Sequence, residues 1–186
     1  MNHVGTRPIE TERLVLRRMT VADALDAFDN WLSDPEVALY MQWDAQTDVE
    51  QAKQYIEKMF VGKYENNTFY RWAIALKTDN AVIGSVGFEI HSERDSVADV
   101  SYGLCKRFWN QGIMSEALTA VIDYAFREVG VNRIEAFHAA ANPASGRVMQ
   151  KTGMKLEGHA RQKYRSHKGF EDCDLYAILR DDYNFK

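Results

Sequence analysis

Cysteine, proline and long hydrophobic runs are all scarce in this chain of 186 residues. Its two cysteines, Cys105 and Cys173, lie far apart and outside any CxxC pattern, so neither a disulfide scaffold nor a structural zinc site is indicated. Three prolines and eleven glycines exclude a collagen-like or linker composition. No apolar run reaches the ~18 residues of a membrane-spanning helix, and the first residues lack the apolar core of a signal peptide. The sequence therefore predicts a globular, cytoplasmic protein with no metal ion and no membrane contact.

An excess of positive charge is also missing, because 23 basic side chains face 27 acidic ones and the formal net charge is −4. Without a basic field, direct binding to nucleic acid is not expected. The charges are nevertheless distributed unevenly. Residues 23–65 hold ten acidic side chains and three lysines, whereas residues 147–168 hold seven basic side chains and one glutamate. Two solvated faces explain this split as well as two binding surfaces would, one for an anionic and one for a cationic ligand.

The length and the absence of repeats or linker-like tracts predict one domain, residues 1–186. Apolar patterns predict strands at 14–17, 70–76, 81–90, 97–104, 133–140 and 175–179, with a long polar loop before the last. Helices are predicted from Thr20 to Trp31, after Thr47, up to Val129 and at 143–152. Antiparallel hairpins that lead into a strand, helix, strand unit predict a mixed α/β sheet of about six to seven strands with helices on both faces.

The most regular helix follows a glycine-containing loop. Its apolar stripe ends at Gly130, and the loop before it contains Asn110-Gln111-Gly112. A helix start has up to four unpaired backbone N–H groups and a positive dipole end, so this order of strand, loop and helix favours a pyrophosphate site. A simple turn before a capped helix explains the same residues equally well. The sequence has no GxxxxGK[ST], GxGxxG, GxSxG or HExxH pattern, which excludes P-loop, Rossmann, hydrolase and zincin sites.

Two motifs resemble those of a known family. Residues 111–113 (QGI) and 115–118 (SEAL) resemble the acyl-CoA pyrophosphate loop of the GNAT N-acetyltransferase superfamily. Residues 142–145 (NPAS) and 151–154 (KTGM) resemble its second motif. The early stretch at 11–17 (TERLVLR) is similar to the branch that holds the ribosomal-protein N-terminal (Rim-type) acetyltransferases. The resemblance covers nearly the whole chain and implies a single N-acetyltransferase domain that uses acetyl-CoA as co-substrate.

The resemblance also assigns residues to acetyl-CoA. A strand end would pair with the pantetheine arm, the helix start would hold the pyrophosphate, and the second motif would bind the arm and the sulfur. In that order the residues are Tyr102, Gly103 and Leu104, then Asn110, Gln111, Gly112, Ile113, Met114 and Ser115, then Asn142 and Ser145. Trp109 departs from the family pattern, since it stands where the loop usually has an arginine, so a side-chain contact to phosphate is lost there.

Proton transfer has three candidate catalytic residues, Ser145, Tyr164 and Glu135. A thiol titrates near pH ~8.5, so a leaving thiolate needs modest acid help, which a serine or tyrosine hydroxyl could give. Glu135 could relay the amine proton through water, as could Asp99 or His138. Ordinary structural roles compete with each assignment: a helix N-cap for the serine, core packing for the tyrosine and histidine, and solvent-facing strand positions for the carboxylates.

The acceptor is less constrained than the co-substrate. Met149 stands where several family members place a tyrosine acid, so that route is closed. Direct attack of a primary amine within a ternary complex is expected. A protein N-terminal amine, as in ribosomal proteins, is the leading interpretation, because an α-amine has a pKa of ~8 and needs little base. A small amine such as a polyamine, amino acid or aminoglycoside is the alternative, and a non-catalytic acyl-CoA-binding module is a further one. Homodimer formation is left open.

Overall fold

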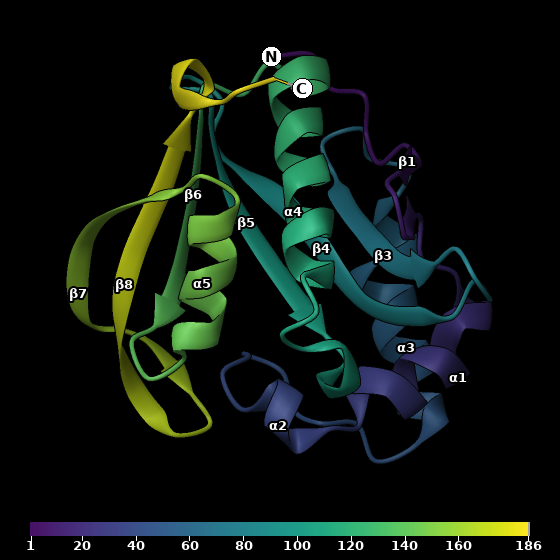
Figure 1. Ribbon diagram of the computed structural model, residues 1–186. Coiled ribbons are helices and arrows are strands. Elements are labelled where there is room, and N and C mark those ends of the chain that lie inside the picture. Colours follow the sequence, from purple (N-terminus) through teal and green to yellow (C-terminus); the bar gives the residue numbers. More distant parts are fainter. Residues whose placement is uncertain (186) are drawn as a thin grey trace.

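The computed structural model describes residues 1–185 and centres on one sheet of eight strands (Figure 1). The strands are β1 (Ile9–Glu10), β2 (Leu14–Arg17), β3 (Tyr70–Leu76), β4 (Val82–Ser92), β5 (Val97–Leu104), β6 (Arg133–Ala139), β7 (Lys155–Ser166) and β8 (Gly169–Leu179). Their spatial order is β1-β2-β3-β4-β5-β6-β8-β7, and every neighbouring pair is antiparallel except β5 and β6. The predicted mixed α/β fold is confirmed, with eight strands in place of six or seven.

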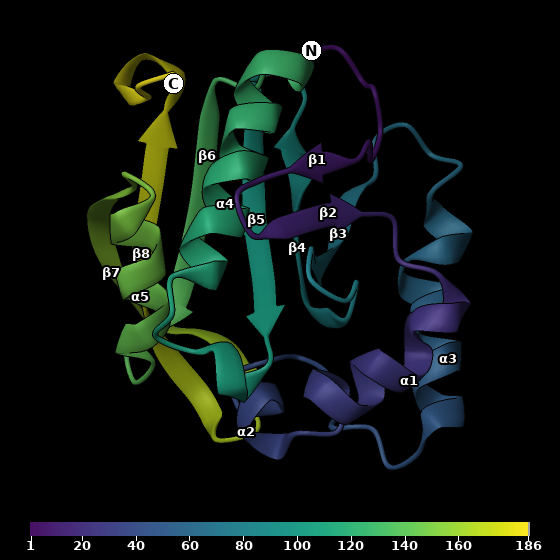
Figure 2. The same ribbon diagram turned by 45° about the vertical axis from the view of Figure 1, so that its right-hand side comes forward.

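Helices cover both faces of this sheet, as Figure 2 shows, with α4 and α5 on one face and α1 and α3 on the other. They are α1 (Ala24–Ala27), α2 (Pro35–Ala38), α3 (Val49–Met59), α4 (Ile113–Tyr124) and α5 (Pro143–Lys151). A π-helical turn extends α4 to Val129, and Gly130 ends it with a φ of 79°. Helix α3 begins one residue later than predicted, because Asp48 rather than Thr47 accepts the hydrogen bond from the Gln51 N–H. In the described chain, 1–185, no helix is long and apolar enough to span a membrane.

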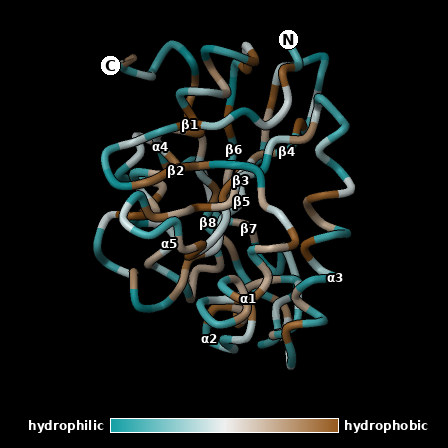
Figure 3. Tube along the Cα trace, turned by 90° about the vertical axis from the view of Figure 1, so that its right-hand side faces the viewer, coloured by the Kyte–Doolittle hydropathy of each residue, from teal (hydrophilic) through white to brown (hydrophobic). Residues whose placement is uncertain are grey.

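The core lies between the sheet and these helices. Apolar segments, brown in Figure 3, run through the central strands, while polar segments lie mainly on the outside. The largest fully buried side chains include Trp72, Tyr70 and Phe88 on neighbouring strands, and the rings of Tyr70 and Phe88 stack with centroids 4.4 Å apart. Burial of these aromatic surfaces fixes β3 and β4 as the rigid centre of the sheet.

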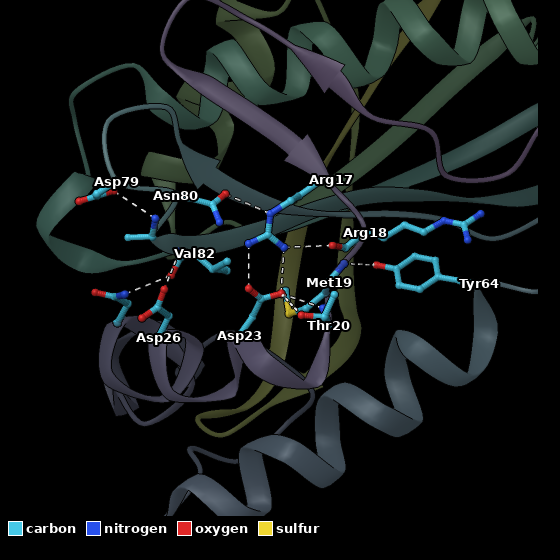
Figure 4. Close-up of polar contacts among 12 residues, drawn as sticks. Arg17, Arg18, Met19, Thr20, Asp23, Asp26, Tyr64, Asp79, Asn80 and Val82 are labelled. Carbon is cyan, nitrogen blue, oxygen red and sulfur yellow. Dashed lines mark hydrogen bonds and ion pairs between the residues drawn. The ribbon is translucent and has the colours of Figure 1, made fainter.

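A polar cluster fixes the connection between β2 and the first helical turn (Figure 4). Asp23 accepts the Thr20 backbone N–H at 2.7 Å and two hydrogen bonds from Arg17 at 2.9 and 2.7 Å. These bonds outweigh burial and lower the pKa of Asp23, while the Tyr64 hydroxyl accepts the buried N–H of Met19 at 2.8 Å. Asp23 is thus the acidic N3 residue of the turn that Thr20 begins, and it anchors the segment that leads into α1.

Residues 155–174 were expected to form a polar loop, and this expectation is wrong. They form β7 and the first half of β8, a long hairpin at the edge of the sheet. Most side chains of β7 are exposed, because an edge strand that is covered by little else has no apolar face to bury. Its Lys and Arg residues interrupt the alternation of apolar and polar residues from which a half-buried strand is predicted.

The two central parallel strands separate along their length. Pairing of β5 with β6 is confined to residues 97–99 against residues 133–135. Beyond Asp99, no strand within residues 1–185 pairs with the β6-facing backbone groups of β5. The sheet is therefore open between Val100 and Leu104, beside the start of α4 and next to α5 (Figure 1).

Candidate functional site

The loop before α4 points unpaired backbone donors toward the opening in the sheet. Gly112 is the N-cap of α4 with a φ of 76°, and Asn110 also has a positive φ, 61°. This left-handed backbone turns the chain so that the N–H groups of Ile113, Met114 and Ser115 begin the helix without an intrahelical partner. A glycine is needed at 112 because other residues adopt this φ at a cost. The loop thus has the geometry of an anion cradle.

A side-chain clamp holds this loop to the hairpin of β1 and β2. Glu116 on the first turn of α4 accepts hydrogen bonds from the Thr11 hydroxyl at 2.6 Å and from the Arg13 backbone and guanidinium at 2.9 and 2.7 Å. Arg13 also donates to the Gln111 carbonyl at 3.0 Å. Burial acts to raise the pKa of Glu116, but these bonds outweigh it and lower the pKa. No role was predicted for Arg13, which fastens the loop from 98 residues away.

A cavity of about 300 Å³ opens at this loop and is bounded by α2, α4, α5 and the end of β5. Every residue predicted to bind the co-substrate lines it except Gln111, whose side-chain amide donates to the Arg107 carbonyl. Arg147 and Lys151, from the basic segment 147–168, also line it. The structure therefore brings all the residues predicted for the co-substrate except Gln111 to one place, which is called the α4 cavity below.

Trp109, which replaces the usual arginine of the loop, has a structural part in this cavity. It lines the α4 cavity and its indole N–H donates to the Leu104 carbonyl at 2.8 Å. This bond joins the end of β5 to the loop that follows. Glu36 on α2, which also lines the cavity, forms an exposed ion pair with Lys106.

A second cavity, of about 590 Å³, lies on the α3 face of the sheet and is called the α3 cavity below. Its walls are aromatic and its floor is the exposed face of β3, β4 and β5. The charged side chains that line it are Lys63, Arg71, Glu89 and Asp99. None of the acidic side chains in residues 23–65 lines it. The acidic segment therefore does not supply this cavity with negative charge that would attract a cationic acceptor.

The two cavities meet, because Tyr102, Gly103, Asn142 and Ser145 line both. Gly103 leaves room at this point, since a Cβ there would lie 3.4 Å from the Met41 methyl group. A ligand in the α4 cavity and a ligand in the α3 cavity would therefore contact each other where β5 and α5 come together.

Ser145 lies at this meeting point, hydrogen-bonded to Tyr102. The Tyr102 hydroxyl is 2.9 Å from the Ser145 Oγ and donates to the Ser145 carbonyl at 3.0 Å. Burial raises the pKa of Tyr102 far above its ordinary value, although the bond to Ser145 lowers it in part. Tyr102 is therefore a neutral hydroxyl at physiological pH and can orient that of Ser145. The sequence indicated only a backbone role for Tyr102, so this partner was missed.

Tyr164 lines the α3 cavity, but its hydroxyl is engaged elsewhere. It donates to the Tyr40 carbonyl at 3.1 Å, and the Tyr40 hydroxyl in turn donates to the Ala141 carbonyl at 3.1 Å. Burial, followed by the charge of Glu171, raises the pKa of Tyr164 to about 12. Tyr164 thus holds the segment after α2 over the cavity, and it contacts Ser145 through no hydrogen bond in the described residues.

The structure does not bring Glu135 to the cavities. Glu135 lines neither of them and is bonded to Arg133 at 2.6 Å. Its neighbour across the β5–β6 pair, Asp99, lines the α3 cavity. The Asp99 carboxylate has no hydrogen-bond partner in the described part of the chain. Burial, followed by the charge of Glu135, raises the pKa of Asp99. Of the carboxylates considered from the sequence, Asp99 is the one that faces the opening.

His138 is enclosed by its surroundings. Its Nδ1 is bonded to the Ala139 carbonyl at 2.7 Å, and its Nε2 faces Gly146, where a Cβ would come within 2.4 Å. Among the described residues the Nε2 has no hydrogen-bond partner, and Asp174 lies 3.9 Å away. His138 therefore fixes the place of α5 by its close contact with a glycine. Among residues 1–185, no group of three or more His, Cys, Asp or Glu side chains could hold a metal ion.

The comparison with known families agrees with this geometry. The profile described as Acetyltransferase (GNAT) domain matches residues 13–155. The chain belongs to the GNAT acetyltransferase family. The "Uncharacterized N-acetyltransferase p20" of Bacillus licheniformis is 33% identical over 173 residues, which are 93% of this chain and 96% of the relative. This GNAT protein is therefore an acyltransferase, and its relatives indicate an N-acetyltransferase.

Solved structures show the same fold. The crystal structure of a GNAT-family acetyltransferase from Bacillus anthracis is 26% identical, with a TM-score of 0.81 over 94% of this chain and 99% of that one. A ribosomal L7/L12 alpha-N-protein acetyltransferase, RimL, solved in complex with coenzyme A, is 21% identical with a TM-score of 0.80 over 95% of this chain and 100% of that one. The similarity to RimL is one of fold.

Proposed function

We propose that this GNAT protein transfers the acetyl group of acetyl-CoA to a primary amine by direct attack within a ternary complex. The observation that carries the proposal is the meeting of two cavities at Tyr102, Gly103, Asn142 and Ser145. An acyl donor in one cavity and an amine in the other would react there without a covalent enzyme intermediate. The two cysteines do not compete for such a step, because both are buried and burial raises the pKa of Cys173.

The residues of the α4 cavity fit acetyl-CoA. The N–H groups at the start of α4 suit a pyrophosphate, and Arg147 and Lys151 add positive charge near them. The unpaired edge of β5 beyond Asp99 suits a pantetheine arm, which would add to the sheet as a further strand. Acetyl-CoA supplies the activated acyl group. The coenzyme A bound by the structurally similar RimL supports the choice of co-substrate.

Ser145 and Asp99 divide the proton transfers in this proposal. The Ser145 hydroxyl, whose proton lies in the hydrogen bond with Tyr102, would turn this proton to the departing sulfur. Asp99, whose pKa is raised, would take the amine proton through water. An α-amine, with a pKa of ~8, needs less help than a lysine side chain at ~10.4. Backbone N–H groups of β5 that lack a strand partner would stabilise the oxyanion.

The acceptor proposed first is a protein N-terminal amine, in keeping with the L7/L12 acetyltransferase of the same fold. A small amine is the second candidate, because the cavity of about 590 Å³ has the volume of a small-molecule site. A cytoplasmic location is proposed with it, since both cysteines are unpaired.

Release of coenzyme A thiol tests the function. Purified protein is mixed with acetyl-CoA and a panel of peptides and small amines, and the free thiol is followed over time, with mass spectrometry of the acceptor. We expect acceptor-dependent release and an acceptor heavier by one acetyl group. Binding of acetyl-CoA without release for every amine would contradict the proposal.

A further inference from the structure

Arg71 lies across the floor of the α3 cavity. It is opposite Gly87 on β4, which is in turn opposite Ser101 on β5. Because Gly87 has no side chain, the Arg71 guanidinium crosses β4 and its Nη2 donates to the Ser101 Oγ at 2.7 Å. A Cβ on Gly87 would come within 2.4 Å of the Tyr70 carbonyl oxygen and 2.8 Å of the Arg71 Cα. Gly87 thus leaves the space across β4 that the Arg71 side chain occupies.

Several donors around Arg71 lack an acceptor. Its Nε and Nη1 have no hydrogen-bond partner among residues 1–185. The Ser101 hydroxyl accepts from Arg71, so its own proton is free to donate. The Tyr55 hydroxyl, in the same cavity, also has no partner in the described chain, and the Arg71 charge acts against the burial that raises the pKa of Tyr55. Donors grouped in this way around one guanidinium suit the oxygen atoms of an anion.

Arg71 is only loosely paired with the acidic side chains of the cavity, through a long contact with the exposed Glu89. The Glu89 Oε1 is 3.9 Å from the Arg71 Nη2, too far for a hydrogen bond, and the Glu89 side chain is 76% exposed. Asp99 forms no ion pair with Arg71. The other cation, Lys63, lies 5.7 Å from the centre of the Phe69 ring and is directed to that ring. Arg71 is therefore the cation available to a ligand on the floor.

The position of Ser101 sets the distance between two groups of this ligand. Ser101 is two residues from Gly103 on the same face of β5, which is about 7 Å at ~3.3 Å per strand residue. We propose that the acceptor is a primary amine that also carries a carboxylate about 7 Å away, and that Arg71 and Ser101 bind this carboxylate while the amine lies at Gly103. The proposal rests on the proposed function, of which it names the acceptor class. A dipeptide and a protein N-terminus with an acidic second residue both have this chemistry.

Matched acceptors test the proposal and distinguish the two sources. One pair is Ala-Ala and its C-terminal amide, which differ in the terminal carboxylate. The other pair is the peptide amides Ala-Asp-Ala and Ala-Asn-Ala, which differ in a side-chain carboxylate. For each pair we measure kcat/KM by thiol release, and the dissociation constant by calorimetry in the presence of coenzyme A. We expect the acid of at least one pair to be preferred about ten-fold or more, because a charged hydrogen bond is lost in its partner.

Variants assign the preference to Arg71. In Arg71→Met the ratio of acid to amide falls to about one, and in Arg71→Lys part of it returns, because the charge is kept without the planar fork. Lys63→Met is the matched control, since it removes the other cation of the cavity and should keep the ratio. Circular dichroism and the affinity for coenzyme A confirm that each variant is folded.

The outcomes separate this proposal from the proposed function. Equal binding and turnover of acid and amide in both pairs, with turnover present, overturns the carboxylate site and leaves the acetyltransferase standing. A preference that survives in Arg71→Met, or is lost in Lys63→Met, overturns the role of Arg71. Absence of turnover with every amine contradicts the proposed function, while the calorimetric ratio still decides whether an anion binds at Arg71.

Discussion

The α4 cavity and the α3 cavity meet at Ser145 but are built in different ways. The α4 cavity depends on backbone: a left-handed Gly112, the unpaired N–H groups that follow it and an open strand edge. The α3 cavity depends on side chains that come from β3, β5 and the distant hairpin of β7 and β8, such as Arg71, Asp99 and Tyr164. A backbone site suits a ligand shared by a whole family, whereas a side-chain site can change its ligand with little change of fold.

The largest effect is expected from a charge at the backbone site. In Gly112→Asp, the left-handed φ of 76° is strained and a negative charge is added beside the N–H groups that would hold the pyrophosphate, so the affinity for acetyl-CoA should fall on the order of 100-fold or more. Calorimetry measures this. Gly130→Asp is the matched control, because it has a φ of 79° at the far end of the same helix with nothing within 4 Å of a Cβ. Gly130→Asp should lose stability and keep the affinity; equal losses in both variants would mean that strain alone is responsible.

The next effect concerns the hydroxyl pair where the cavities meet. Ser145→Ala should lower kcat by about 10- to 100-fold, because the sulfur loses its proton donor while the backbone cradle is intact. Tyr102→Phe should lower kcat less, and the double variant should resemble Ser145→Ala, since both act through one hydrogen bond of 2.9 Å. Steady-state kinetics with a separate measurement of acetyl-CoA affinity decides this. An unchanged kcat in Ser145→Ala would exclude Ser145 as the acid.

Tyr164→Phe is compared with the variants of Ser145 and Tyr102, because Tyr164 is the other hydroxyl predicted as a proton donor. It removes the bond to the Tyr40 carbonyl and loosens the segment over the α3 cavity, so the KM for the acceptor should rise more than kcat falls. A fall in kcat alone would restore Tyr164 as the proton donor.

The contrast between a backbone site and a side-chain site also explains which of the two cavities could be predicted from the sequence. The loop at 110–115 and the start of α5 are contiguous in sequence, and glycine, asparagine and serine at fixed spacing indicate a backbone site without knowledge of the tertiary fold. The strands β3, β4 and β5 were predicted because they are buried and apolar.

The α3 cavity could not be found in this way. Arg71 is a single charged residue in a buried strand, and its role depends on the glycine opposite it. The choice between Asp99 and Glu135 depends on register, because the two are directly paired and one lies beside Arg133 while the other faces the opening. The hairpin that carries Tyr164 lies at a sheet edge, where its exposed charged residues give no periodic signal.

A smaller effect, and one of opposite sign for stability and activity, is expected at Asp99. Its pKa is raised in the folded protein, so the charged form opposes folding above the ordinary pKa of 3.8, and stability is lost as the pH rises from there through the folded-state value. Asp99→Asn should therefore raise the melting temperature at neutral pH. It should lower kcat/KM about ten-fold and remove the acidic limb of the pH–rate profile that belongs to this carboxylate. A profile unchanged in Asp99→Asn would show that the amine loses its proton by another route.

The smallest effect is expected at the clamp that joins the backbone site to the β1–β2 hairpin. Glu116 has a lowered pKa, so its contribution to stability is present above its ordinary value of 4.5 and is lost as the pH falls through the folded-state value. Glu116→Gln keeps the shape and removes the charge that Arg13 and Thr11 contact. We expect a lower melting temperature at pH 7, a difference from the wild type that shrinks below pH 4.5, and a KM for acetyl-CoA raised a few-fold because the loop at Gly112 is less firmly held. If the acceptor KM rose instead, the clamp would serve the α3 cavity, and the separation of the two sites into backbone and side-chain parts would not hold.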